Sequence, residues 1–553
     1  MFGHPKGLMI LFFTEMWERF SYYGMRAILV LYVASTIENG GLGWTQGEAL
    51  ALYGWYTMMV YLLGVPGGWI ADKFLGQKKT VMLGGALLCL GHGILAFESL
   101  WAFYLGLSLI VLGVGGLKPN ISTMVGGLYK QGDAKRDQGF TIFYIGINTG
   151  AFIGSIIVGY VGEAINWHLG FGLAGIGMFL GQIVFVWGQK YLKEVGNLVV
   201  VQRQANSNKA VPLTEQEKDR MLVLLISYLI IFVFWAAFEQ AGGLMNIYAS
   251  EKINRIVGGF EIPASIFQSV NAFFIMTFGT AVGSFWIARQ RAGKENSALY
   301  KMAVGTMITG MGFLMMAAAS VQVSGEAFGK AGLHWLILAY WLHTMGELCL
   351  SPVSLSFVTK LAPARYVASM MGIYWAAVGF GNKFAGIIGE ASRAEPIKIE
   401  LLAPKTSFEA FQEIGQAINN DKDFKLRASI SLENGQVKLQ ELDTKTDLLP
   451  LFKLDENSKA EMMHELEDMH KEGKDRLHAT LALSKDVEAK KIAANKGDAQ
   501  NYSGTLQVEE VQNKRELNTF LFVMFATVGF GILLLIFFKK LKKLTHGAED
   551  VAK

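Results

Sequence analysis

The chain has 553 residues, of which 52% are hydrophobic and 12% are aromatic, and its formal net charge is +4. A soluble globule cannot bury that much apolar material, so we expect most of it to face the lipid bilayer. The small charge, and the dispersal of the basic residues between apolar runs, argue against nucleic acid as a partner. Cys89 and Cys349 lie inside apolar runs and indicate neither a disulfide framework nor a metal site.

A membrane-spanning helix needs roughly 20 mostly apolar residues. The N-terminal segment lacks a short hydrophobic region followed by a cleavage site, so we expect an uncleaved first span and not a signal peptide. The sequence predicts twelve spans at about 8–36, 48–71, 80–97, 100–128, 137–161, 169–192, 221–250, 263–289, 297–322, 332–361, 365–391 and 516–538.

The basic residues of the loops indicate the orientation, because short cytoplasmic loops are enriched in lysine and arginine. Alternate loops and the C-terminal tail hold most of these residues, for example Lys78 and Lys540. The opposite short loops contain only Lys252, Arg255 and Lys330. We therefore expect a multi-pass protein of the cytoplasmic (inner or plasma) membrane with both termini in the cytoplasm.

Two long hydrophilic stretches divide the predicted spans. The stretch 193–220 follows the sixth span and is a predicted cytoplasmic linker between two halves, as in the major facilitator architecture, whose substrate site lies between the halves. We predict an all-α membrane protein with the major facilitator fold, 12 transmembrane helices and two six-helix bundles. The N-terminal bundle covers 1–192, helices 7–11 cover 221–391, and helix 12 with a cytoplasmic tail covers 516–553.

The second hydrophilic stretch, 392–515, is a predicted soluble extracytoplasmic insert between helices 11 and 12. Leu426–Leu439 alternates apolar and polar residues around Asn434-Gly435, which predicts a β-hairpin. Ser458–Lys491 is rich in Glu, Lys, Ala and Leu, which predicts a helix. We interpret the insert as a small accessory domain or a partly ordered segment.

Charged and aromatic residues follow one face of the first predicted span, at helical offsets of 0, 3, 4, 7, 8 and 11. They are Glu15, Glu18, Arg19, Tyr22, Tyr23 and Arg26. Each ionised group at the bilayer centre costs on the order of 2.5–3.5 kcal/mol, so four of them on one helix require a hydrated cavity and mutual pairing. A salt bridge that only joins two helices is the alternative, but such a role would not need two acids, two bases and two tyrosines.

Further polar residues lie inside other predicted spans of both halves. They are Lys118, Asn148, Glu239, Gln240, Asn271 and Glu347. A cavity with Arg26 and Lys118 on one side and Glu347 on the other suits a zwitterion, whose carboxylate and ammonium groups lie at opposite ends. This charge distribution favours amino acids or short peptides over sugars.

The run from Glu15 to Tyr23 resembles the E-x-x-E-R-F-x-Y-Y signature of the proton-dependent oligopeptide transporter (POT/PTR) family of the major facilitator superfamily. The segments around Lys118-Pro119-Asn120 and from Phe143 to Gly150 resemble its two other signatures, and the match covers roughly 8–391 and 516–541. The resemblance implies a symporter, not an enzyme, that imports di- and tripeptides with protons by alternating access. We expect it to work as a monomer, with protons as the coupling ion and without a cofactor or a metal.

The resemblance also implies roles for individual residues. The proton-coupling residues are Glu15, Glu18, Arg19 and Lys118. The peptide-binding residues are Tyr22, Tyr23, Arg26, Lys118, Asn148, Asn271, Glu347 and Trp375, with Glu347 meeting the amino terminus of the peptide. The gating residues are Arg26 with Glu239 on the outer side, and Asp72 with Lys78 in a cytoplasmic loop. The alternative interpretation of this loop is an ordinary basic turn without a gating role.

The sequence departs from the family's pattern at Gly54 and in the position of the insert 392–515. The second-span histidine of animal members aligns with Gly54, so proton coupling is expected to depend on carboxylates, and His343 is either part of a proton path or a hydrogen-bonded residue of the bundle. Animal members carry their external domain between spans nine and ten, so the resemblance assigns no role to 392–515.

Two alternative functions stay open. The chain could carry another small anion or zwitterion, or it could anchor an enzyme or binding module in the insert. The insert lacks the common catalytic motifs.

Overall fold

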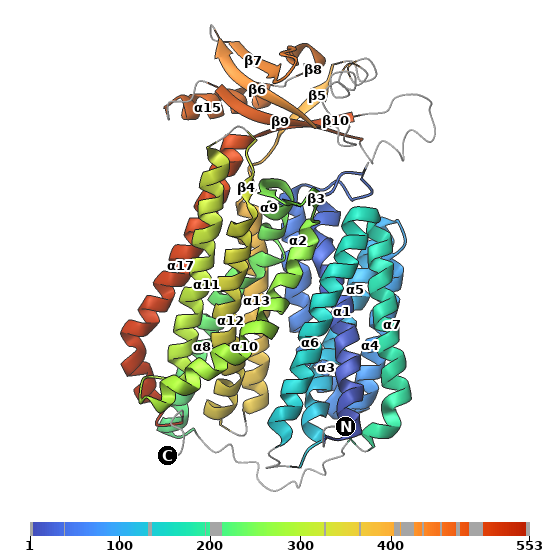
Figure 1. The fold of residues 1–553 in the computed structure, drawn as a ribbon, viewed down its shortest axis with the longest axis vertical. Helices are drawn as coiled ribbons and strands as arrows, with labels where there is room; N and C mark the ends of the chain where they lie inside the picture. The colour runs from blue at the N-terminus through green and yellow to red at the C-terminus, as the bar shows by residue number, and fades with distance from the viewer. Residues whose placement is uncertain are drawn as a thin grey trace.

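The computed structural model shows a tall bundle of helices that carries a small sheet domain at one end (Figure 1). The first helix begins and the last helix ends at the opposite end of the bundle. The structure describes residues 4–37, 39–130, 135–193, 195–198, 213–325, 328–363, 366–402, 407, 410, 425–433, 436–453, 456–471, 476–485 and 502–548.

The N-terminal half consists of helices with short connections. Their bounds are α1 Lys6–Ala34, α2 Gln46–Leu62, α3 Gly64–Ile70, α4 Gln77–Leu95, α5 Leu100–Gly127, α6 Lys135–Tyr160 and α7 Trp167–Leu192. Single π-helical turns extend α3 to Leu75 and α6 to Ile165. The start of α2 is set by a capping box, in which Thr45 and Glu48 satisfy each other's backbone amides. Gly76 has a φ of 78°, which separates the end of α3 from α4.

The C-terminal half has a similar series of helices. Their bounds are α8 Glu215–Phe238, α9 Leu244–Lys252, α10 Gln268–Arg291, α11 Ala298–Ser324, α12 Leu333–Leu361, α13 Val367–Ala391 and α17 Glu509–Leu544. A 3-10 turn, Glu239–Ala241, separates α8 from α9, and another, Ala264–Phe267, precedes α10. Short strands join loops at the insert end of the bundle: β1 Ile253–Asn254 pairs with β4 Ala331–Gly332, and β2 Ile256–Val257 pairs with β3 Phe260–Glu261.

Each predicted span is matched by a described helix or by a pair of consecutive helices. The pairs are α2 with α3 and α8 with α9. Eight described helical segments are long and apolar enough to cross a membrane. Large apolar side chains such as Trp101, Trp187 and Ile536 are exposed on the bundle, a surface suited to lipid. The helical membrane-protein prediction is therefore confirmed, whereas the count of twelve crossings and the domain boundaries stay predictions.

The two halves approach each other closely where α2 crosses α13. A Cβ atom added at Gly54 would lie 2.9 Å from the Cα of Gly386, and one added at Gly386 would lie 2.8 Å from the Cα of Gly54. The helices therefore meet backbone to backbone at this point. A side chain at position 54 would not fit into this arrangement, which is a physical reason for the glycine.

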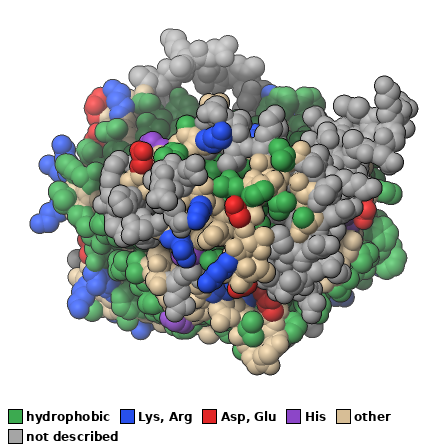
Figure 2. Space-filling view, turned by 90° about the horizontal axis from the view of Figure 1, so that it is seen from above, with side chains coloured by type: hydrophobic (Ala, Val, Ile, Leu, Met, Phe, Trp, Pro, Cys, Tyr) green, Lys and Arg blue, Asp and Glu red, His purple; other side chains and the backbone are tan. Residues whose placement is uncertain are grey.

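The insert forms an antiparallel sheet with the strand order β7-β6-β9-β10-β5-β8. The bounds are β5 Ile397–Leu401, β6 Lys425–Glu433, β7 Gln436–Glu441, β8 Phe452–Lys453, α15 Glu456–Lys471, β9 Arg476–Lys485 and β10 Tyr502–Val508. Met462 and Leu466 of α15 share a core with Leu481 and Leu506 of the sheet. Seen from the insert end, basic, acidic and hydrophobic side chains are interspersed (Figure 2), as on water-exposed surfaces.

The structure confirms one prediction for the insert and corrects two. Strands β6 and β7 form the predicted hairpin, although the Asn434-Gly435 turn lies outside the described residues. The helix predicted over Ser458–Lys491 ends at Lys471, and Arg476–Lys485 is the strand β9. Composition favoured a helix there, but alternate residues of β9 are buried and the strand pairs with both β6 and β10. Helix 12 begins at Glu509 and not at 516, because its polar first turns continue the helix beyond the apolar stretch.

Candidate functional site

The charged stripe of α1 forms a buried ion cluster. The Nε atom of Arg19 lies 2.9 Å from Oε1 of Glu15 and 2.5 Å from Oε2 of Glu18. All three side chains are at most 3% exposed. Two carboxylates thus share one guanidinium, which leaves one surplus negative charge when both are ionised. Removal of one partner from such a buried pair typically costs about 3–5 kcal/mol, so the cluster is strongly constrained.

Lys118 of α5 is held by aromatic rings from both halves. Its Nζ atom lies 3.8 Å from the ring centroid of Tyr61 and 5.5 Å from that of Trp375. The two rings stack with their centroids 5.7 Å apart and an interplanar angle of 21°. A cation over an aromatic face gains electrostatic stabilisation, most of all where it is shielded from water. The ammonium group of Lys118 also acts electrostatically on Glu15 and Glu18, so it belongs to the same cluster.

Arg26 lies about two helical turns beyond Arg19 along α1 and meets the C-terminal half. Its Nη1 atom lies 3.5 Å from Oε1 of Glu239, and the hydroxyl of Tyr53 in α2 donates to the same carboxylate oxygen. Arg26 also lies over the ring of Tyr23, 5.3 Å from its centroid. Tyr22 packs edge to face against Tyr23 and contacts the guanidinium of Arg19. The predicted outer gating pair is therefore formed, and it joins α1 and α2 to the bend between α8 and α9.

Glu347 is positioned by its neighbours in the C-terminal half. The amide of Asn271 in α10 donates to Oε2 of Glu347 in α12 at 2.9 Å and to the hydroxyl of Thr344 at 3.0 Å. One carboxylate oxygen of Glu347 is thus fixed in direction. Asn148 of α6 donates to the carbonyl of Tyr144 in its own helix at 2.9 Å. The structure brings Asn271 and Glu347 into direct contact, whereas the polar group of Asn148 is occupied within its helix.

The predicted cytoplasmic gating residues lie apart from this cluster. Nζ of Lys78 donates to the carbonyl of Lys193 at 2.6 Å, and its backbone amide donates to the carbonyl of Gly196 at 2.8 Å. Lys78 therefore attaches the start of α4 to the segment that follows α7. Asp72 is exposed in the π-helical turn before Gly76. Among the described contacts Lys78 meets Lys193 and not Asp72, and the gating role of both residues stays a prediction.

His343 of α12 is buried against aromatic rings. Its ring centroid lies 4.6 Å from that of Phe313 and 6.4 Å from that of Phe238. Within the described part of the chain, neither ring nitrogen has a hydrogen-bond partner. Neither of the two alternatives for His343 is supported by these contacts, in which the ring packs as an aromatic residue.

A protein-family model described as POT family matches residues 78–199 and 197–402. A Yersinia enterocolitica relative, named peptide transporter YePEPT, is 35% identical over 458 residues, which cover 72% of this chain and 89% of the relative. The chain belongs to the POT family. It is accordingly a multi-pass membrane transporter and not an enzyme.

Other members of the POT family match over a similar length. A Bacillus subtilis relative, named uncharacterized transporter YclF, is 37% identical over 68% of this chain and 85% of its own length. A relative of Lactococcus lactis subsp. cremoris, named di-/tripeptide transporter, is 36% identical over 68% of this chain and 87% of its own length. The family model ends at residue 402, close to the start of the insert sheet.

Solved structures of POT family members share the fold. A crystal structure of a mutant peptide transporter POT in complex with alafosfalin is 34% identical and has a TM-score of 0.65, covering 75% of this chain and 93% of that one. A POT family transporter in complex with 5-aminolevulinic acid is 30% identical, with a TM-score of 0.65, covering 70% of this chain and 91% of that one. The predicted major facilitator fold is therefore confirmed.

Sequence reasoning missed two tyrosines of this POT family site. Tyr53 hydrogen-bonds to the carboxylate of Glu239, and Tyr61 contacts Lys118 and Trp375. Both lie in α2, outside the three signatures, in a span that also contains Tyr56. Aromatic residues are common in membrane spans, so the sequence around them contained no signal that singled them out.

We predict that Tyr53→Phe weakens the outer gate. The substitution removes a hydrogen bond to a buried carboxylate, and the loss of such a bond costs about 1.5–3 kcal/mol. We expect a lower thermal midpoint for the purified protein. Tyr56→Phe is the matched control, because the Tyr56 hydroxyl is buried in the same helix without a hydrogen-bond partner among the described residues. Equal midpoints for the two variants would contradict the role given to Tyr53.

Proposed function

We propose that this POT family member imports di- and tripeptides together with protons across the cytoplasmic membrane by alternating access. The observation that carries the proposal is the division of charge between the halves. Lys118 and Arg26 project from helices of the N-terminal half, and Glu347 with Asn271 projects from the C-terminal half. A zwitterion that binds between the halves would place its carboxylate towards the cations and its ammonium group towards Glu347.

The names of the relatives support this class of substrate. Two Lactococcus relatives are named di-/tripeptide transporters, and the Yersinia relative is named a peptide transporter. The transporter solved with 5-aminolevulinic acid favours a second candidate, a small zwitterion that is not a peptide. Both candidates share a free ammonium group and a free carboxylate, and direct competition for uptake distinguishes them.

We infer that proton coupling depends on the surplus negative charge of the Glu15–Arg19–Glu18 cluster. A proton on one of the two carboxylates neutralises that charge. Lys118 can then leave the cluster, because its departure no longer leaves a carboxylate without a cation. A substrate carboxylate that attracts Lys118 or Arg26 favours protonation of the cluster for the same reason. Peptide and proton would thus stabilise the same state, which is the thermodynamic requirement for symport.

The outer gate supplies the conformational part of the proposal. Arg26 and Tyr53 belong to the N-terminal half and Glu239 to the C-terminal half, so an outward opening must separate a buried ion pair. The insert and the two chain ends lie at opposite ends of the bundle (Figure 1). With the basic loops in the cytoplasm, the insert faces outward and both termini lie inside. We propose that a single chain completes the cycle.

Glu18→Gln tests the coupling. The amide cannot take up or release a proton, so we expect proton-driven accumulation of labelled dialanine in liposomes to fall to the level of protein-free vesicles. Counterflow, which needs no net proton movement, should persist. The control is Glu215→Gln, which removes one partner of an exposed cytoplasmic ion pair with Lys218. Gradient-driven uptake by Glu18→Gln at the level of the unsubstituted protein would refute the coupling role.

Glu347→Gln tests recognition of the amino terminus. A hydrogen bond between charged groups contributes about 1.5–3 kcal/mol, so the affinity for dialanine should fall roughly tenfold to hundredfold. N-acetyl-dialanine lacks the ammonium group, and its weak binding should change little. The measurement is the inhibition constant of each compound in counterflow. Equal losses for both compounds would show that Glu347 does not read the amino terminus.

A further inference from the structure

The outer ends of several helices converge on the guanidinium of Arg393, which follows α13 and is 7% exposed. Its Nη1 atom lies 2.9 Å from Oε1 of Glu516 in α17 and 3.7 Å from Oε2 of Glu251 in α9. The same atom donates to Oε1 of Gln46 in α2 at 2.7 Å. Glu516 is fully buried, so this ion pair is shielded from water.

Gln46 is the member of this group that belongs to the N-terminal half. Its amide oxygen accepts from Arg393, and its amide nitrogen donates to Glu251. Both polar atoms of one side chain are thus bound to the C-terminal half. Because α2 and α13 must separate at their outer ends for the cavity to open outward, such an opening breaks both hydrogen bonds. We call Gln46, Glu251, Arg393 and Glu516 the rim latch.

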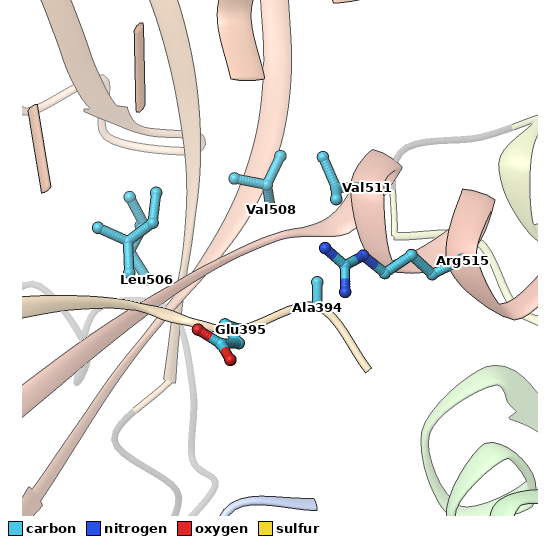
Figure 3. A pocket seen from close by; sticks show the side chains of 7 residues that line it. Ala394, Glu395, Leu506, Val508, Val511 and Arg515 are labelled. Atoms are coloured by element: carbon cyan, nitrogen blue, oxygen red, sulfur yellow. The ribbon is translucent and has the colours of Figure 1, made fainter. Parts of the chain in front are cut away.

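The two connections of the insert hold the rim latch in place. On the first connection, the amide of Ala394 donates to Gln512 at 2.8 Å. On the second, Nη1 of Arg515 donates to the carbonyl of Arg393 at 2.9 Å, and Gln512 donates to Glu516 at 2.9 Å. Figure 3 shows Ala394 beside Val511 and Arg515, where both connections line one small pocket. The chain entering the sheet and the chain leaving it are therefore bound to each other directly above the ion pair.

The sheet itself is joined to the same helices through its strand β9. The hydroxyl of Thr480 donates to Oε1 of Glu509 at 2.7 Å, and Oε2 of Glu509 pairs with Lys252 at the end of α9. Beside them, His478 donates through its backbone amide to Glu510 at 2.9 Å. Glu509 and Glu510 begin α17, which carries Glu516. The insert thus contacts α17 directly and is linked to α9 through the Glu509–Lys252 pair.

A second contact across the outer rim lies away from this group. The carboxylate of Glu163, after α6, accepts from the backbone amides of Ala264 and Ser265 at 2.8 Å each and lies 3.7 Å from Arg255. It joins the two halves through residues outside the insert. Among the described contacts, that of Glu163 is therefore not linked to the insert, and it supplies an internal control.

We propose that the insert acts as a brace for the outer gate. It holds Arg393 and Glu516 so that Gln46 closes the rim latch, in addition to the Arg26–Glu239 pair, and it thereby favours the outward-closed state. This proposal rests on alternating access as the mode of transport, but it does not depend on which substrate is carried.

The test is electron paramagnetic resonance distance measurement on the full chain in liposomes. Spin labels replace Phe97, in the exposed loop between α4 and α5, and Val257, which is exposed in β2, after Cys89 and Cys349 are changed to serine. Gln46→Leu should raise the ratio of long to short distances about tenfold, as expected for losing a hydrogen bond to a charged group. Thr480→Val should raise it in the same direction by a smaller factor.

The combinations of variants identify the brace. Adding Thr480→Val to Gln46→Leu should produce no further opening, because both act through one latch, whereas Thr480→Val and Glu163→Gln should have multiplicative effects. The matched control is Thr505→Val, which lies on the same face of the adjacent strand β10 and makes no side-chain hydrogen bond among those described. It should leave the distances unchanged.

Three outcomes would overturn the proposal: unchanged distances in Gln46→Leu, unchanged distances in Thr480→Val, or multiplicative effects of these two. Gln46→Ala repeats the first test with a smaller side chain, should the leucine disturb the rim. Failure of alternating access would look different, since Glu163→Gln and addition of dialanine would then also leave the distances unchanged.

Discussion

The rest of the structure depends on one constraint, which is that a charge inside a membrane needs a partner. Arg19 satisfies two carboxylates of its own helix, and Lys118 finds aromatic faces instead of a simple counterion. Ionised groups cost several kcal/mol when they are unpaired in hydrocarbon. The buried charges of this transporter therefore stabilise one another. If one of them moves, its neighbours lose a partner and become less stable.

Several of these partners come from opposite halves of the protein, and this links charge to conformation. Arg26 of α1 needs Glu239 of the C-terminal half, and Lys118 of α5 lies against Trp375 of α13. In the proposed cycle, a relative rotation of the halves would exchange such contacts for others. The proposed coupling ion and zwitterionic substrate are suited to that exchange, because each would neutralise or replace one of the charges that the rotation exposes.

The same constraint extends to the outer rim, where the soluble insert joins the membrane helices. The first turns of α17 are polar and continue directly from strand β10, and their acids pair with Lys252 and Arg393. The insert sheet is thereby connected through ion pairs to α9, α13 and α17 of the bundle. This connection lies outside the family's sequence signatures, which fall in the first half of the chain.

The sequence by itself determined the positions of the helices, the face of α1 that carries charge and the family. Those properties depend on local periodicity and on residue types at fixed spacing. The roles expected for Arg26, Glu239, Asn271 and Glu347 came from the family resemblance that these patterns carry. Only the tertiary structure decided that Tyr53 and Tyr61 belong to that site, that β9 is a strand, and that Arg393 meets Gln46. Each of these depends on partners far away in the chain, and a single sequence does not specify which helix faces or strand edges pack together.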